Sequence, residues 1–483
     1  MKKLLAILLA VIMVLGMVAC AAKTETPAAE TPKAEEPKKE EPKAEEPKAE
    51  EPKAEAPAEA IEITYYCSHG NFGEILQKEI DKWNEGEGKE KGVFLNLVMN
   101  VNNYSADLEA LMQAGNYFDI DDLQEQKYLE QGFIQDWAEI GAAYPEVQAL
   151  IDSYEPYMTS EKTGDVIRCL PMEIVPIKFA INTDLFEKNN LEYPKTWEDI
   201  YNCAKVITEN GNGEEFGMGW STWSAMYRRL IMKGGMDNYE KAWWDANTET
   251  YSFAQYEGPL NYVKKMYEEG LLLGTDDLAI DPIRAEFAKG RVGMFLAPAY
   301  DYAVYTSQFP AECNWTVIEI PEWTEGSSQY KRCYMSSNRG GCSISKPAWD
   351  AADQAKKDAL VAAVLFLNSD ELYAEFYRQG AIIPVKPEIV ANNTPYDYVG
   401  PQWALFADAT NYYPAPVYPD GLLLLDGDNY ATVMGAYIHG DLGDDWAPVA
   451  ADLEERYNAA YEALKSDGIT DLTNYTAPWD HTK

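Results

Sequence analysis

The feature that most constrains the fold is a regular exchange of strand-like and helix-like periodicity after residue 60. Residues 61–66 alternate in the manner of a half-buried strand, and the turn-forming residues 67–71 follow. Leu76, Ile80 and Trp83 then repeat at helical spacing, and the alternation returns over residues 93–101. This order predicts a parallel, doubly wound α/β unit, in which ligands lie at the carboxyl ends of the strands.

The same pattern continues along the chain. A further helix is predicted to begin with Ser105 as its N-cap and to end at Gly115. Because 483 residues are too many for one compact core, we expect two such α/β lobes. The later elements are predicted as strands at 177–181 and 291–296, a helix opened by a capping box at Thr196–Asp199, and a helix at 359–367.

The first 20 residues have the pattern of an export signal. Two lysines precede an apolar run of 16 residues, Leu4 to Ala19, which is shorter than the roughly 20 residues of a membrane-spanning helix. Met17-Val18-Ala19-Cys20 resembles the bacterial lipoprotein signal, with Met17 where Leu is usual. The resemblance implies cleavage before Cys20 and lipidation of its thiol; an ordinary cleaved signal is the alternative.

Residues 21–60 form a low-complexity segment. Proline recurs at every fifth position within a repeating EEPKA unit, and the segment contains no aromatic or large apolar residue. Such a segment cannot bury enough surface to offset its ordering entropy, so it is predicted to be disordered. With about 3.1 Å per residue it reaches on the order of 100 Å, which is the behaviour of a tether.

Composition and motifs exclude several classes of function. The chain has 40 Lys and Arg against 80 Asp and Glu, a net charge of −40, which argues against a nucleic-acid partner. Three histidines argue against a His-built metal site or a charge-relay hydrolase. The sequence has no G-x-S-x-G elbow, P-loop, HExxH or Rossmann motif, and DGD at 426–428 is too short for an EF-hand. We therefore expect no metal and no cofactor.

Several segments resemble a known family. ITYYCSHGN, LMQAGNYFDI, LEQGFIQDW, FAKGRVGMFLAPAY and GCSISKPAW occur in the order seen in extracellular solute-binding proteins of carbohydrate ABC importers, family 1, the group of maltose-binding protein. The most specific segment is Leu170 to Ile200. Gly115 and Asp119 match the family's Gly-x-x-x-Asp turn, although Phe118 replaces its usual Pro. The resemblance covers about residues 61–483.

The resemblance implies a periplasmic-binding-protein-like type II fold, with two doubly wound lobes joined by crossing hinge segments. The implied lobes are residues 61–172 plus 338–385 and residues 173–337 plus 386–483. The implied function is capture of a carbohydrate, expected to be an oligosaccharide, and its delivery to the permease subunits of an ABC importer, without catalysis. We expect a monomer on the extracellular face of the cell membrane, held there by the lipid anchor alone.

A sugar site needs flat aromatic rings for C–H faces and carboxylates or amides for hydroxyls. In the family, several loops that carry such side chains surround the ligand. Asp119 lies in one of these loops but is interpreted as a structural turn former rather than a ligand contact. His69 has a second interpretation as a loop hydrogen-bonder, and Trp220 and Trp223 as core residues. The candidate ligand contacts are Ser68, His69, Asn71, Asn116, Tyr117, Glu173, Trp220, Trp223, Tyr300, Asp301, Tyr418 and Asp420.

Six cysteines remain after Cys20, and none forms a CxxC pair. Cys313 and Cys333 flank a predicted hairpin, so one disulfide between them is an option in an exported protein, while free thiols are expected for most of the others.

Two other functions stay open at the sequence level. One keeps the fold but binds a cationic solute such as a polyamine, a peptide or a metal complex, which the acidic chain would attract. The other is a secreted glycosidase that uses two carboxylates.

Overall fold

The computed structural model describes residues 60–101, 103–158, 161–221, 226, 243–274, 280–324, 326, 332–333, 339–408, 412–413, 418–468 and 470–476. The predicted signal peptide with Cys20 and almost all of the predicted tether lie outside the described residues. No helix within the described ranges is long and apolar enough to span a membrane.

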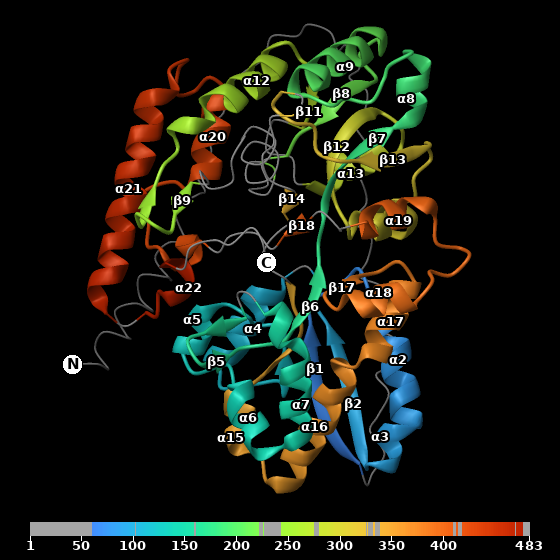
Figure 1. The fold of residues 1–483 in the computed structure, drawn as a ribbon, viewed down its shortest axis with the longest axis vertical. Helices are drawn as coiled ribbons and strands as arrows, with labels where there is room; N and C mark the ends of the chain where they lie inside the picture. The colour runs from blue at the N-terminus through green and yellow to red at the C-terminus, as the bar shows by residue number, and fades with distance from the viewer. Residues whose placement is uncertain are drawn as a thin grey trace, which may run out of the picture. The chain divides into compact units, whose positions relative to one another are not determined.

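The first sheet has the strand order β16-β3-β1-β2, and its strands β1 and β2 lie side by side in Figure 1. The predicted first strand is β1 (Ile61–Cys67), and it pairs in parallel with β2 (Val93–Met99) and β3 (Ile120–Asp121). β16 (Ser343–Ile344) pairs antiparallel with β3, so the sheet is mixed rather than purely parallel. The carboxyl ends of three parallel strands therefore meet at one edge, as the sequence predicted.

The first helices agree with the sequence analysis in all but one detail. α2 (Gly73–Glu85) buries the predicted Leu76, Ile80 and Trp83. α4 begins one residue before Ser105, with Asn103 at the N-cap position and without a side-chain capping bond, so the prediction of Ser105 as N-cap is wrong. Gly115 follows the helix with φ of +78°, a conformation that glycine adopts without strain. The other elements of this region are α3 (Glu87–Glu90), α4 (Tyr104–Gln113), α5 (Gln126–Glu130), α6 (Trp137–Ala143), α7 (Pro145–Tyr154), η1 (Glu155–Tyr157), β4 (Lys162–Thr163) and β5 (Val166–Ile167).

The second sheet has the order β11-β8-β12-β7-β13. Its strands include the predicted β7 (Ile177–Asn182), which pairs antiparallel with both of its neighbours. The predicted capping box at Thr196 and Asp199 is present at the start of α9 (Trp197–Asn210). The remaining elements are α8 (Thr183–Lys188), β8 (Phe216–Gly219), β9 (Trp244–Asp245), β10 (Thr250–Tyr251), η4 (Ala254–Tyr256), α12 (Glu257–Glu268), β11 (Leu272–Leu273), α13 (Ile280–Ala288), β12 (Val292–Pro298), α14 (Asp301–Ala303), η5 (Val304–Gln308), β13 (Trp315–Ile318) and β14 (Arg332–Cys333).

The last third of the chain contributes to both regions. The apolar stretch 359–367 lies in α16 (Gln354–Leu367), as predicted. The other elements are β15 (Arg339–Gly340), α15 (Lys346–Ala351), α17 (Asp370–Arg378), β17 (Ile383–Pro384), α18 (Pro387–Asn392), α19 (Pro401–Ala407), β18 (Tyr412–Tyr413), η6 (Pro419–Leu422), α20 (Tyr430–Ile438), α21 (Trp446–Asp467) and α22 (Thr473–Thr476).

Buried apolar side chains gather into two large cores. The first core draws its members from between Ile63 and Met172 and between Cys342 and Ile389. The second core draws its members from between Val175 and Ile320 and from Tyr377 onward to Tyr461. A smaller cluster that includes Tyr66 and Leu108 adjoins the elements of the first sheet.

One strand carries the chain from the first core into the second. β6 (Pro171–Ile174) pairs with β15 and β17 in a three-stranded sheet, and β7 begins only three residues after β6 ends. Ile174 packs against both cores. In Figure 1, β6 runs on toward β7 with β17 beside it.

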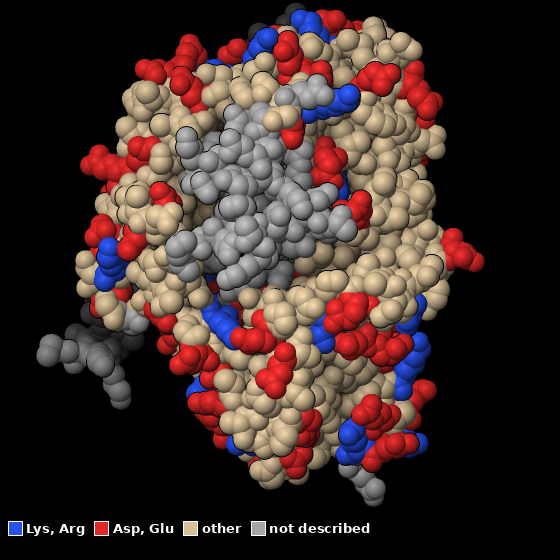
Figure 2. Space-filling model, in the orientation of Figure 1, with Lys and Arg blue, Asp and Glu red and all other residues tan. Residues whose placement is uncertain are grey.

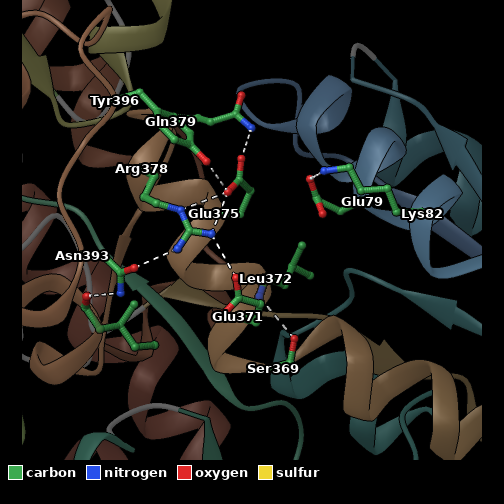
Figure 3. Close-up of polar contacts among 11 residues, drawn as sticks. Glu79, Lys82, Ser369, Glu371, Leu372, Glu375, Arg378, Gln379, Asn393 and Tyr396 are labelled. Atoms are coloured by element: carbon green, nitrogen blue, oxygen red, sulfur yellow. Dashed lines mark hydrogen bonds and ion pairs between the residues drawn. The ribbon is translucent and has the colours of Figure 1, made fainter. Parts of the chain in front are cut away.

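The helix next to β17 is held by a charged network that is fully paired (Figure 3). Arg378 of α17 donates to Glu375 Oε2 at 2.7 Å and to Asn393 Oδ1 at 2.8 Å. Tyr396 and Gln379 also donate to Glu375. Burial raises the pKa of Glu375, but these hydrogen bonds outweigh burial and hold its pKa below the usual value. The network therefore ties α17 to the segment that follows α18.

The disulfide that the sequence left as an option between Cys313 and Cys333 is not formed. Cys313 is a free thiol and donates to the carbonyl of Phe287 at 3.4 Å. Cys67, Cys169, Cys203 and Cys342 are free and buried, which agrees with their interpretation as small core residues.

Candidate functional site

The turn after β1, residues 68–71, is organised by a carboxylate from another segment. Asp122 follows directly on β3, and its Oδ2 accepts hydrogen bonds from the Ser68 backbone N at 2.6 Å and from Ser68 Oγ at 2.9 Å. Its Oδ1 accepts from the Tyr65 hydroxyl at 2.7 Å. The Asp122 amide donates to the Tyr104 hydroxyl at 2.6 Å. We call this arrangement the Asp122 hub; it joins β1, β3 and α4.

Two more predicted residues of this turn pack inward. His69 is 4% exposed, its ring stacks on Phe72 with centroids 5.0 Å apart, and its Nε2 lies 3.6 Å from Asp122 Oδ2. Asn71 donates from Nδ2 to the carbonyl of Ala381 at 3.3 Å, just before β17. The β1 turn is therefore bonded to the segment that flanks the crossing strands.

One carboxyl group and two tyrosine hydroxyls at this edge have raised pKa values. Burial, together with the neighbouring Asp122 and Glu125 charges, raises the pKa of Asp121 to about 8, against the opposing effect of a hydrogen bond from the Leu123 amide. Burial, followed by the Asp122 charge, also raises the pKa of Tyr65 and of Tyr104. Asp121 is therefore neutral over most of the physiological pH range.

The turn at 115–119 presents polar and aromatic groups to solvent. Asn116 is exposed and Tyr117 is 40% exposed, with its ring 6.3 Å from that of Phe133. Asp119 instead accepts from the Thr64 backbone at 2.8 Å and pairs with Lys356 at 2.9 Å, which is the structural role expected of it.

The turn after β12, residues 299–301, contains Tyr300 and Asp301. Tyr300 is half-buried and packs against the second core, while Asp301 is 0% exposed. Arg284 of α13 donates to Asp301 Oδ1, and the Arg284 guanidinium carbon lies 5.7 Å from the centroid of the Tyr300 ring. Asp301 therefore holds the turn from within, and of the two residues only Tyr300 has solvent-accessible surface of any extent.

Tyr418 and Asp420 lie together at the start of η6. Tyr418 stacks on Trp243 with centroids 3.9 Å apart and planes 29° apart. Asp420 accepts from Trp243 Nε1 and from the Tyr251 hydroxyl, both at 2.8 Å. Asp420 thus fixes the aromatic pair, and Tyr418 is its partly exposed member.

Three of the predicted ligand contacts do not lie in these turns. Glu173 is 2% exposed on β6, where it faces Arg339 of β15 and Pro384 of β17 in the strand register. Trp220 is 1% exposed and belongs to the second core. Trp223 lies outside the described residues.

Sequence reasoning missed Asp122, Arg284 and Trp243, which bond to the candidate residues Ser68, Asp301 and Asp420. Asp122 bonds to a residue 54 positions away, and Arg284 to one 17 positions away. The only local signal was the position of Asp122 directly after a strand, the same rule that selected Ser68. Within the described residues no group of three or more His, Cys, Asp or Glu side chains is arranged to hold a metal ion.

Comparison with known proteins identifies relatives of this fold. A sequence model of the bacterial extracellular solute-binding proteins matches residues 84–401. No curated protein sequence matches the chain significantly.

Solved structures match over most of the chain. The substrate-binding protein Lmo0181 of Listeria monocytogenes, solved with cycloalternan, is 17% identical, covers 84% of this chain and 99% of its own, and has a TM-score of 0.60. The GacH receptor of Streptomyces glaucescens, solved unliganded and with acarbose, is 13% identical over 84% and 98%, with a TM-score of 0.63. RafE of Streptococcus pneumoniae, solved with raffinose, is 15% identical over 84% and 100%, with a TM-score of 0.59.

Proposed function

Because the chain belongs to the bacterial extracellular solute-binding proteins, we propose that it captures a carbohydrate and delivers it to an ABC importer. The family consists of binding proteins that act outside the cytoplasmic membrane. The observation that carries the sugar assignment is the match along whole chains to receptors solved with cycloalternan, raffinose and acarbose. An oligosaccharide is the ligand class that these three have in common.

The two cores support a two-lobe arrangement. We propose that the first lobe comprises residues 61–172 plus 338–385, and that the second comprises residues 173–337 plus 386–483. β6 and β17 lie at the passage between the cores, where Ile174 contacts both. Crossing strands of this kind are suited to hinge motion around a ligand.

We propose that the ligand is held by accessible side chains whose supports are buried. Tyr117, Tyr300 and Tyr418 are aromatic and at least partly exposed, and each packs against another ring or cation. Ser68 supplies a polar group at the carboxyl end of β1, and Asn116 supplies an exposed amide in the turn that precedes β3. Flat rings and polar groups are what a sugar requires.

A thermal-shift screen of the purified protein tests this function. The probes are raffinose, maltotetraose, xylotetraose, chitotetraose and spermidine. A probe present at 100 times its Kd should stabilise the protein by about 2.7 kcal/mol. Stabilisation by one of the oligosaccharides supports the proposal; stabilisation by spermidine alone contradicts it.

The salt dependence of the binding affinity distinguishes a cationic ligand from a neutral sugar. Acidic side chains are spread over the face drawn in Figure 2, with Lys and Arg between them. Binding of a cation should weaken steeply between low and physiological salt, because charge attraction is screened over about 8–10 Å. Binding of a neutral sugar, measured by isothermal titration, should stay constant.

The glycosidase alternative is tested by incubation. A binding protein should return each oligosaccharide intact after prolonged incubation, as judged by chromatography. Hydrolysis that disappears with one carboxylate substitution would contradict a pure binding role.

Lipid anchoring is a separate part of the proposal. If Cys20 carries the lipid, Cys20→Ala should release the protein into the medium or leave the precursor unprocessed. Normal processing with continued membrane retention would contradict the anchor.

A further inference from the structure

The turn that presents Tyr300 rests on a buried ion pair. Asp301 is 0% exposed and Arg284 is 7% exposed. The Arg284 guanidinium donates to Asp301 Oδ1, and its Nη1 donates to Asp281 Oδ1 at 3.0 Å. The same guanidinium lies 5.7 Å from the Tyr300 ring centroid, within the range of a cation–π contact. One side chain therefore contacts both residues of the turn.

This ion pair is poorly suited to stabilise the fold. Among the described residues, Arg284 Nε, Asp301 Oδ2 and the Tyr305 hydroxyl are buried without a hydrogen-bond partner. Each such atom carries an uncompensated desolvation cost. An apolar pair of similar volume would often be as stable or more so. Stability therefore does not explain why these charges are present.

The charged network of α17 shows the difference. Glu375 accepts hydrogen bonds from Arg378, Gln379 and Tyr396, so both of its oxygens are paired (Figure 3). The Arg284–Asp301 pair leaves atoms of both partners unpaired. The Arg284–Asp301 pair is distinguished by its location, because Arg284 contacts the accessible ring of Tyr300 at the carboxyl end of β12.

The backbone after the turn is also unusual. Asp301 begins α14, which passes directly into the π-helix η5. π-Helical turns are rare and occur frequently at functional sites. The ion pair connects α13 to the turn, and the charges of Asp301 and Arg284 both act on the buried Tyr305 of η5.

We propose that Arg284 is a positioning residue, which fixes the Tyr300 ring for ligand stacking through its ion pair with Asp301 and its contact with the ring face. The inference rests on the proposed function in one respect, namely that Tyr300 contacts the ligand. Holding the ring in one orientation lowers the entropy lost on binding.

The pair should respond to pH. The charged and titratable groups that face Asp301 are Arg284 and Asp281 of α13 and Tyr305 of η5. Burial raises the pKa of Asp301 to about 6, against the opposing effect of Arg284. Below about pH 6 the carboxyl is therefore neutral, and the ion pair that orients Arg284 is lost. The Tyr300 ring should change its environment across this pH.

The first test needs no ligand. A fluorotyrosine is placed at position 300 alone, and its ¹⁹F resonance is followed from about pH 5 to about pH 8. The native protein should show a titration near pH 6, whereas Asp301→Asn should show none. Arg284→Met should also show none, and Arg284→Lys should retain part of it, because a lysine keeps the charge but not the fork geometry.

The matched control is Arg378→Met, which removes the guanidinium of the fully paired network and should leave the titration unchanged. If Arg284→Met does not fold, Asp301→Asn and Arg284→Lys still decide. A resonance that does not titrate in the native protein, or that titrates equally in Asp301→Asn, would overturn the inference.

The second test uses affinity for the oligosaccharide that the thermal-shift screen selects from the four named above. Arg284→Met should weaken binding roughly 2- to 30-fold, the scale of a lost cation–π contact, and Arg284→Lys should weaken it by a smaller factor, because lysine keeps the charge but not the fork geometry. Native affinity should fall as the pH drops through about 6, and affinity of Asp301→Asn should not depend on pH in this range. Unchanged affinity in Arg284→Lys would contradict the inference. An intact ¹⁹F titration with no oligosaccharide binding would contradict the proposed function instead, so the two failures are distinguishable.

Discussion

The turns after β1 and after β12 occupy the same position in their sheets but are supported in opposite ways. The β1 turn is held by Asp122, whose carboxylate accepts from a tyrosine hydroxyl, a serine hydroxyl and a backbone amide. The β12 turn is held by Asp301, whose carboxylate, in the part of the chain that the structure describes, accepts from one cation, Arg284. Asp122 is stabilised by donors from several segments, so the loss of one donor removes only part of its hydrogen bonding. Asp301 depends mainly on Arg284, so the loss of Arg284 removes most of its stabilisation.

The largest effect should come from breaking the ion pair. Asp301→Ala removes the buried partner of Arg284 and leaves its guanidinium paired with the exposed carboxylate of Asp281, so we expect a loss of about 3–5 kcal/mol in the free energy of unfolding. The double variant Arg284→Met, Asp301→Leu should recover most of this loss, because no buried charge remains. Urea unfolding of the purified protein, followed by tryptophan fluorescence, measures both. A loss below about 1 kcal/mol in Asp301→Ala would contradict the assigned burial cost.

A smaller but substantial effect is expected at the Asp122 hub. Asp122→Ala leaves the Tyr65 hydroxyl and two Ser68 groups without their acceptor, which should cost about 2–4 kcal/mol. Asp122→Asn keeps one acceptor oxygen and should cost about half as much. Asp350→Ala, which breaks an exposed pair with Lys346, should change stability by less than about 1 kcal/mol. Equal losses in the alanine variants of Asp122 and Asp350 would show that the hub has no special importance.

Substitutions in the two turns should also differ in their effect on ligand affinity. Tyr300→Ala should weaken oligosaccharide binding by about 1–3 kcal/mol, the scale of an aromatic hot spot, at low and at physiological salt alike. Ser68→Ala removes one hydroxyl and should weaken binding by at most about 1 kcal/mol. Isothermal titration at two salt concentrations measures both. A larger loss in Ser68→Ala than in Tyr300→Ala would reverse the proposed division between aromatic contact and polar support.

The sequence predicted the backbone at both turns because local periodicity determines it. β1, α2 and β12 and the capping box of α9 follow from spacing within a few residues, and each is present. Ser105 failed as an N-cap because the helix begins at Tyr104, and a shift of one residue is below what local capping preferences resolve.

The supports of the turns were not predictable in the same way. Asp122 and Arg284 lie 54 and 17 positions from their partners in the sequence, and only the folded chain brings them together. Trp220 shows the same limit, since an aromatic residue after a strand fits a ligand site and a core equally well, and the structure buries it. Sequence therefore located the turns, and tertiary packing decided which of their side chains remain accessible.

The effect of pH is the smallest when it is taken per pH unit, and it again distinguishes the two regions. Burial raises the pKa of Asp121, beside the hub, to about 8 and that of Asp301 to about 6, both above the usual value for an aspartate. The folded state therefore binds a proton that the unfolded state has released, so stability should fall as pH rises. The contribution of Asp301 should be lost between about pH 4 and 6, and that of Asp121 should continue to be lost up to about pH 8. One proton changes the free energy of unfolding by at most about 1.4 kcal/mol per pH unit.

Urea unfolding at about pH 5, 6, 7 and 8 measures this dependence. The slope of the free energy of unfolding against pH, taken between pH 6 and 8, should disappear in Asp121→Asn and persist in Asp301→Asn. Loss of that slope in Asp301→Asn would mean that the β12 turn, and not the edge of the first sheet, holds the more tightly bound proton.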